Sequence, residues 1–222
     1  MGEKYQLMFL SNLESNNILT NVSTVVSKFG WHYNRFDFGK YSYWSDGPIW
    51  ELGTSKEVTE FEIDNNDNMN RIRDIIEFIS QFYSQSIVFH KLNNDKIISS
   101  IVSIIELSTL PCKEVCVSFE LNDLLTSIEM IDLVTSEIKD IFVNLSININ
   151  PFYGMSAIEM KGLVEGPKKL KIENLILGDF NFFSFECPDL DQFNNISEEY
   201  EIYDHDNIGR FIFTSKYIGE YK

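Results

Sequence analysis

Apolar residues recur at the three- and four-residue spacing of an amphipathic helix in three separate segments of the chain. This spacing predicts helices over residues 16–29, 68–84 and 123–145. Polar side chains can cap the second helix at Asp67 or Asn68 and the third at Asn122. The three apolar stripes consist of Ile18, Leu19, Val22, Val25, Val26 and Phe29, then Ile72, Ile75, Ile76, Ile79, Phe82 and Tyr83, then Ile128, Ile131, Val134, Ile138, Ile141, Phe142 and Leu145.

Many of the remaining segments are short and rich in apolar and aromatic residues, several of them alternating with polar ones, which is typical of β-strands. Residues 97–107 fit either state, because their β-branched side chains favour a strand and their length allows a helix. Since the strands come in groups between the helices, we predict an α+β fold with mostly antiparallel sheet packed against about three helices. The predicted strands lie within residues 5–10, 31–52, 57–63, 87–92, 115–121, 152–160, 172–177, 181–185, 200–203 and 210–217.

The length of 222 residues suits a single compact domain over residues 1–222. A weak internal repeat in the order of the predicted elements supports a second interpretation, a division into two lobes. The order strand, helix, strand occurs near the N-terminus and again from residue 115 to residue 160, although the two segments share almost no residues. Beside the single domain we therefore retain a division into two similar lobes near residues 107–112.

Residue types that carry out catalysis or bind metals are scattered along the chain. Cys112 and Cys116 lie four residues apart and Cys187 is isolated, so they form neither a disulfide framework nor the spacing of a zinc site. The common phosphate-binding, hydrolase and metalloprotease motifs do not occur. We predict no catalytic residues, no metal and no cofactor, and we favour a protein that is not an enzyme.

The chain is strongly acidic, with 34 acidic and 18 basic residues and a net charge of −16. Nucleic acids and anionic membranes attract proteins through Lys and Arg, so neither is an expected partner. A basic protein would be attracted and steered toward this chain. The N-terminus lacks the basic start and the long apolar run of a signal peptide, which predicts a cytoplasmic location.

The acidic residues concentrate near the C-terminus, where residues 172–209 contain no Lys or Arg. Aromatic residues are interleaved with them, and exposed aromatics are frequent anchors of protein interfaces. We predict a partner-binding surface here. The alternatives are an acidic surface that has no binding role and a cation site. The predicted partner-binding residues are Asp189, Asp191, Glu198, Glu199, Tyr200, Glu201, Tyr203, Asp204 and Asp206.

In overall character the chain resembles the immunity proteins of bacterial polymorphic-toxin systems. The resemblance rests on size, acidity, aromatic content and the segments WSDGPIW (44–50) and NPFYG (150–154). It implies a protein that binds and neutralises a toxin domain, often a basic nuclease, and it assigns no site residues.

Two alternatives to a binding protein remain open. The first is an enzyme, hydrolase-like, with a carboxylate or Cys/His site assembled from distant parts of the chain. The second is a structural subunit that forms a homo-oligomer. The sequence itself indicates no particular oligomeric state.

Overall fold

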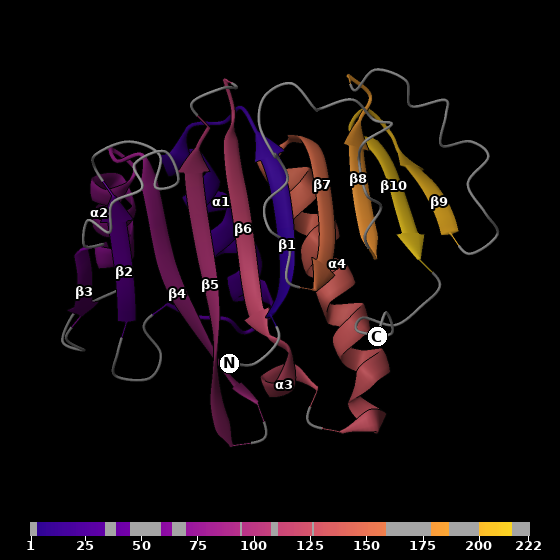
Figure 1. Ribbon diagram of the computed structural model, residues 1–222, viewed down its shortest axis with the longest axis horizontal. Coiled ribbons are helices and arrows are strands. Elements are labelled where there is room, and N and C mark those ends of the chain that lie inside the picture. The colour runs from indigo at the N-terminus through magenta and orange to yellow at the C-terminus, as the bar shows by residue number, and fades with distance from the viewer. Residues whose placement is uncertain are drawn as a thin grey trace.

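The computed structural model describes residues 4–33, 39–44, 59–63, 70–93, 95–107, 111–125, 127–158, 179–186 and 200–214. Ten strands of these ranges form one sheet in the order β3-β2-β4-β5-β6-β1-β7-β8-β10-β9, and every neighbouring pair is antiparallel (Figure 1). The prediction of an α+β fold is confirmed. The strands are β1 (Lys4–Ser11), β2 (Gly39–Trp44), β3 (Thr59–Ile63), β4 (Ser84–Asn93), β5 (Lys96–Glu106), β6 (Lys113–Glu120), β7 (Pro151–Ile158), β8 (Phe180–Ser184), β9 (Tyr200–His205) and β10 (Gly209–Thr214).

The longer helices cover one face of this sheet. They are α1 (Ser15–Lys28), α2 (Asn70–Ile79) and α4 (Ile131–Ile149), and all three lie behind the strands in Figure 1. Helix α1 contacts both α2 and α4, so the three form a layer. Gly30 follows α1 with φ of +83°, a left-handed conformation that glycine adopts without strain.

The core lies between this helical layer and the sheet. Tyr5, Leu7 and Phe9 alternate along β1 toward the helices and are fully buried. The Phe9 ring stacks on Phe142 of α4 with 5.1 Å between the centroids. Gly154 on β7 makes room for that ring, because a Cβ at this position would lie 2.6 Å from a Phe9 ring carbon.

The sheet is continuous across the boundary suggested between two lobes. Strands β5 and β6, on either side of residues 107–112, pair with each other from Ser100↔Phe119 to Glu106↔Lys113. Strand β1 pairs with β6 and β7, which follow it by about a hundred residues or more. The N-terminal strand is therefore built into the C-terminal half of the sheet. The division into lobes, like the single domain, stays a prediction.

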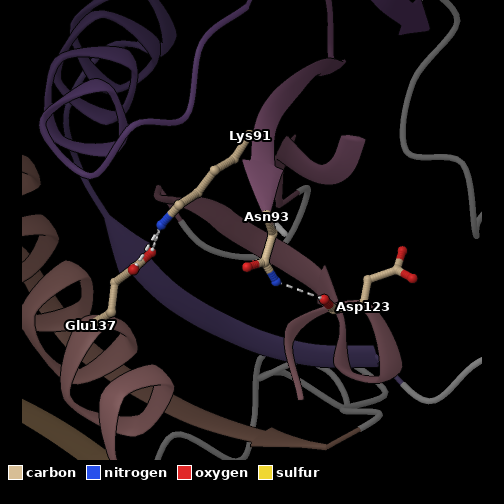
Figure 2. A network of polar contacts seen from close by, with 4 residues as sticks. All are labelled: Lys91, Asn93, Asp123 and Glu137. Atoms are coloured by element: carbon tan, nitrogen blue, oxygen red, sulfur yellow. Dashed lines mark hydrogen bonds and ion pairs between the residues drawn. The ribbon is translucent and has the colours of Figure 1, made fainter. Parts of the chain in front are cut away.

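The third predicted helix is divided, and residues 123–145 do not form one continuous helix. A short helix α3 (Leu121–Leu124) and a 3-10 turn η1 (Ile128–Met130) precede α4. Asn122 lies inside α3 and is not the cap of the long helix. The β4–β5 hairpin contacts α3 just before the break, where Asn93 Nδ2 donates to the Asp123 carbonyl at 3.1 Å (Figure 2) and Lys96 pairs with the Asp123 carboxylate.

A second ion pair attaches α4 itself to the sheet. Lys91 Nζ on β4 lies 2.5 Å and 2.7 Å from the two carboxylate oxygens of Glu137 (Figure 2). The same ammonium lies 5.8 Å from the centroid of the buried Trp31 ring. The hairpin end therefore sets the positions of both α3 and α4.

Other predictions are confirmed with shifted boundaries. Helix α2 ends at Ile79, and β4 already begins at Ser84, the last residue of the predicted helix. Residues 97–107 fitted either state, and all but Leu107 belong to β5, which pairs with β4 on one side and with β6 on the other. The predicted strand 172–177 and the caps Asp67 and Asn68 lie outside the described residues. No helix among the described ranges is both long and apolar enough to cross a membrane.

Candidate partner-binding edge at strand β9

Strand β9 is the last strand on one side of the sheet. It pairs with β10 in unbroken register from Tyr200↔Thr214 to His205↔Gly209. A tight turn joins the two strands, with the Ile208 amide donating to the His205 carbonyl at 3.2 Å. Asn207 adopts φ of +67° there, a conformation that asparagine tolerates better than most residues. Within the described part of the chain, β10 is the only strand paired with β9.

The side chains of β9 are exposed on both faces of the sheet. Tyr203 lies opposite the buried Phe211 and so faces the helical side, where it is 55% exposed. Ile202 faces the other side and is 41% exposed. Both residues are large and apolar or aromatic, the kind that usually loses its exposure when a protein binds a partner.

The acidic side chains of β9 are partly balanced by bases from other elements. Arg210 of β10 donates from Nε and Nη2 to the two oxygens of Asp204, at 2.7 Å and 3.0 Å. These hydrogen bonds hold the pKa of Asp204 below its ordinary value. Lys139 of α4 lies 3.8 Å from Glu201. The absence of Lys and Arg from residues 172–209 therefore does not leave these acids without nearby cations.

Glu201 and Asp206 remain the more available acidic groups of the edge. The Glu201 side chain is 73% exposed, and its pair with Lys139 is long for an ion pair. Asp206 lies in the exposed turn between β9 and β10. A cationic side chain of a partner can reach both carboxylates without displacing an existing short contact.

A line of buried rings supports the exposed Tyr203. Its ring lies 6.4 Å from Phe211, which lies 4.9 Å from Phe182 of β8 and 5.7 Å from Phe213. Through Phe180 and Phe142 these rings continue into the core beside Phe9. The exposed tyrosine therefore lies at the end of a row of aromatic rings that continues into the core.

The structure brings five of the nine predicted partner-binding residues together. Glu201, Tyr203 and Asp204 are exposed on β9, Asp206 is exposed in the adjoining turn, and Tyr200 is half-buried at the start of the strand. The other four lie outside the described residues. These are Asp189, Asp191, Glu198 and Glu199.

A buried polar group that the sequence interpretation did not single out lies nearer the centre of the sheet. Asp179, directly before β8, is 3% exposed and accepts a hydrogen bond of 2.8 Å from the Tyr5 hydroxyl. Ser156 Oγ lies 2.9 Å from the same hydroxyl and accepts the Phe180 amide. Because Tyr5 gives its hydrogen to Asp179, Ser156 must donate to Tyr5.

Burial raises the pKa of Asp179 to about 6, although the hydrogen bond from Tyr5 opposes the rise. The only signal in the sequence is an isolated acid beside the apolar strand that begins at Phe180. Nothing in that pattern identifies Tyr5, 174 residues away, as the partner.

The described cysteines are unsuited to nucleophilic chemistry. Cys112 and Cys116 are free, and burial raises the pKa of each thiol to about 11. The thiolate, the reactive form, is therefore scarce at neutral pH. Within the described ranges, no three His, Cys, Asp or Glu side chains are placed to hold a metal ion. Cys187 lies outside those ranges.

Comparison with known proteins finds a solved structure with a similar fold but assigns the chain to no family. No protein-family model matches the chain, and no curated protein matches it. Among solved structures the fold is similar to Pseudomonas aeruginosa T6SS protein PA0821, with a TM-score of 0.54 and 10% sequence identity. The similarity covers 96% of this chain and 64% of that protein, so this chain spans about two thirds of the other's length.

Proposed function

We propose that this chain is a binding protein that neutralises a basic protein partner, as immunity proteins neutralise toxin domains. The β9 edge and the acidic residues around it form the binding surface. The partner's active surface is covered on binding, so this chain needs no chemistry of its own. The proposed location is the cytoplasm, where an immunity protein of this kind would meet its toxin.

One observation carries the proposal. Strand β9 exposes Ile202 and Tyr203 at the end of a packed sheet and surrounds them with Glu201, Asp204 and Asp206. Apolar anchors supply the buried contact of an interface, while charges around them steer the encounter and select the partner. Acidic charges select a basic partner.

Two further observations support the same function. The net charge of −16 attracts basic proteins over distances comparable with the Debye length, which is about 8 Å at physiological salt. The structurally similar protein is described as a T6SS protein. That description associates this fold with a bacterial secretion system, and the resemblance to toxin-immunity proteins implies a similar setting.

The test begins with capture of partners by the tagged full-length chain from lysates of its source cells, at low and at high salt. Each retained protein is then expressed in a test bacterium with and without this chain. We expect one basic protein to arrest growth and the chain to restore it. If no retained protein is both toxic and neutralised, the proposed function is wrong.

A charge variant assigns the effect to the β9 edge. Glu201→Gln with Asp206→Asn should slow association with the captured partner roughly 3- to 10-fold at low salt, and much less at high salt. The matched control is Glu129→Gln with Asp132→Asn, which removes the same charge from exposed positions in η1 and the first turn of α4. Equal effects of the two pairs would show that total charge matters and the edge does not.

A further inference from the structure

We propose that β9 binds its partner by strand addition, accepting an extended basic segment as the next strand of the sheet. The inference rests on the proposed function, because it specifies how the same edge would hold a basic partner. An edge strand presents a row of backbone N–H and C=O groups that another chain can pair with. Backbone pairing then supplies affinity, and the alternating side chains supply specificity.

Glu201 and Asp204 are the charged side chains of β9, and because they are acidic they disfavour an acidic strand and not a basic one. Otherwise β9, which is paired on one side alone within the described part of the chain, lacks the usual features that prevent an edge from pairing. Its six residues, Tyr200–His205, contain no proline and no lysine, and the register with β10 shows no shift of the kind a bulge produces. Proteins commonly block exposed edges with those features or by making the strand very short. The exposure of β9 side chains on both faces leaves room for neighbouring side chains of an added strand.

The charges of β9 indicate which strand would fit. Glu201 and Tyr203 point to one face of the sheet, and Ile202 and Asp204 point to the other. An added strand would therefore place a Lys or Arg beside Glu201 and an apolar residue beside Tyr203. On the opposite face it would place an apolar side chain beside Ile202. A strand in which a basic residue is followed by two apolar residues meets these requirements.

A second copy of this chain is a poor occupant of the same edge. Pairing two β9 strands brings acidic side chains of one copy near those of the other, and like charges opposite one another destabilise a sheet. The acids thus act against self-association while favouring a basic strand. Discrimination of this kind, by repulsion of the wrong partner, is common at specific interfaces.

The first experiment is hydrogen exchange on the free full-length chain. We expect the backbone amides of residues 200–205 to divide into two alternating sets. The amides that point toward β10 should exchange slowly, and those that point away should exchange rapidly. Slow exchange of both sets would show that the outer edge is already paired, and would overturn the inference.

The second experiment adds a defined probe, the seven-residue peptide Lys-Val-Val-Lys-Val-Val-Lys with blocked ends, whose sequence reads the same in both directions. We expect the peptide to slow exchange of the outer set of β9 amides and of no amides on α4. The control peptide replaces two of the valines with proline, which preserves the charge and removes backbone donors. We expect the control to bind at least about tenfold more weakly, corresponding to the loss of one or more backbone hydrogen bonds.

Each outcome supports or overturns strand addition. Equal binding of the two peptides, weakened alike by salt, would overturn it and leave an acidic docking surface in place. Failure of the lysine–valine peptide to protect the outer amides would also overturn it. Sedimentation of the free chain as a dimer that dissociates on Tyr203→Lys substitution would assign the edge to a second copy. The proposed function is tested by a different result, and it is wrong if no captured toxin is neutralised.

Discussion

Asp179 and Asp204 lie on neighbouring parts of the same sheet, yet their surroundings shift their pKa values in opposite directions. Asp179 lies inside the protein with a neutral hydroxyl as its partner, so desolvation dominates and raises its pKa. Asp204 lies at the edge with the Arg210 guanidinium as its partner, so the hydrogen bonds and the positive charge lower its pKa. The acidity of the C-terminal region is therefore of two physical kinds.

The difference separates the roles of the two carboxylates. Ionised Asp179 costs free energy in the folded state, because the hydrogen bond from the Tyr5 hydroxyl does not replace the hydration that the carboxylate loses on burial. Ionised Asp204 costs little, because water and Arg210 both solvate it. The carboxylates at the edge are accessible to a partner, whereas the interior carboxylate lowers the stability of the fold as the pH rises toward neutrality.

The largest expected change in stability is that of Asp179→Asn, which removes the ionisable group in the interior. The pKa of Asp179 is raised from 3.8 to about 6, so the folded state holds its proton more tightly than the unfolded state. Its contribution to stability is therefore greatest below about pH 4 and falls as the pH rises to about 6. Asparagine still accepts the Tyr5 hydrogen bond and does not ionise.

Relative to the natural chain, we expect Asp179→Asn to gain up to about 3 kcal/mol of unfolding free energy between pH 4 and pH 7. Urea unfolding at several pH values measures this difference, with Asp206→Asn in the exposed turn as the control. A difference between Asp179→Asn and the natural chain that does not change with pH would show that Asp179 titrates normally, and the comparison would break down.

The next largest effect concerns the hydroxyl that serves the interior carboxylate. Tyr5→Phe removes the donor to Asp179 and leaves the rest of the buried ring in place. We expect a loss of about 1–3 kcal/mol at pH 7, where the carboxylate is ionised, and a smaller loss at pH 4, where it is protonated. Urea unfolding at the two pH values checks this, and an equal loss at both would contradict the assigned hydrogen bond.

The smallest effect concerns the edge, through Asp204→Asn. Because this pair with Arg210 is exposed, we expect a loss of less than about 1 kcal/mol, reduced further by salt. The lowered pKa of Asp204 gives the opposite sign from Asp179. The stabilising contribution is present above about pH 4 and disappears as the pH falls below it. A double-mutant cycle with Arg210→Gln measures the coupling, and a coupling of several kcal/mol would show that the edge is less solvated than described.

The sequence predicted the edge less completely than it predicted the helices. It indicated Tyr200, Glu201, Tyr203, Asp204 and Asp206 as neighbours because they are adjacent in the chain and share one strand and turn. It did not indicate that Lys139 and Arg210 would lie beside the acids. Neither did it indicate that the strand would end the sheet, because strand order depends on which distant segments pair.

The sequence did not indicate the division of the third helix either. The apolar spacing from Ile128 to Leu145 continues without interruption, so periodicity alone predicts one helix. The contacts of Asn93 and Lys96 with Asp123 hold α3 against a hairpin that is distant in sequence. Residues 97–106 were decided by pairing with strands on both sides.

By itself the sequence determined the α+β class, the approximate positions of α1, α2 and α4, and the excess of acidic charge, because local spacing and composition control each of these. Tertiary structure alone decided that β1 lies between β6 and β7, that β9 is the last of the described strands on its side of the sheet, and that Asp179 accepts a hydrogen bond from Tyr5. Those features depend on pairing and burial between segments far apart in the chain. Backbone hydrogen bonding and desolvation act on such distant neighbours only after the chain has folded.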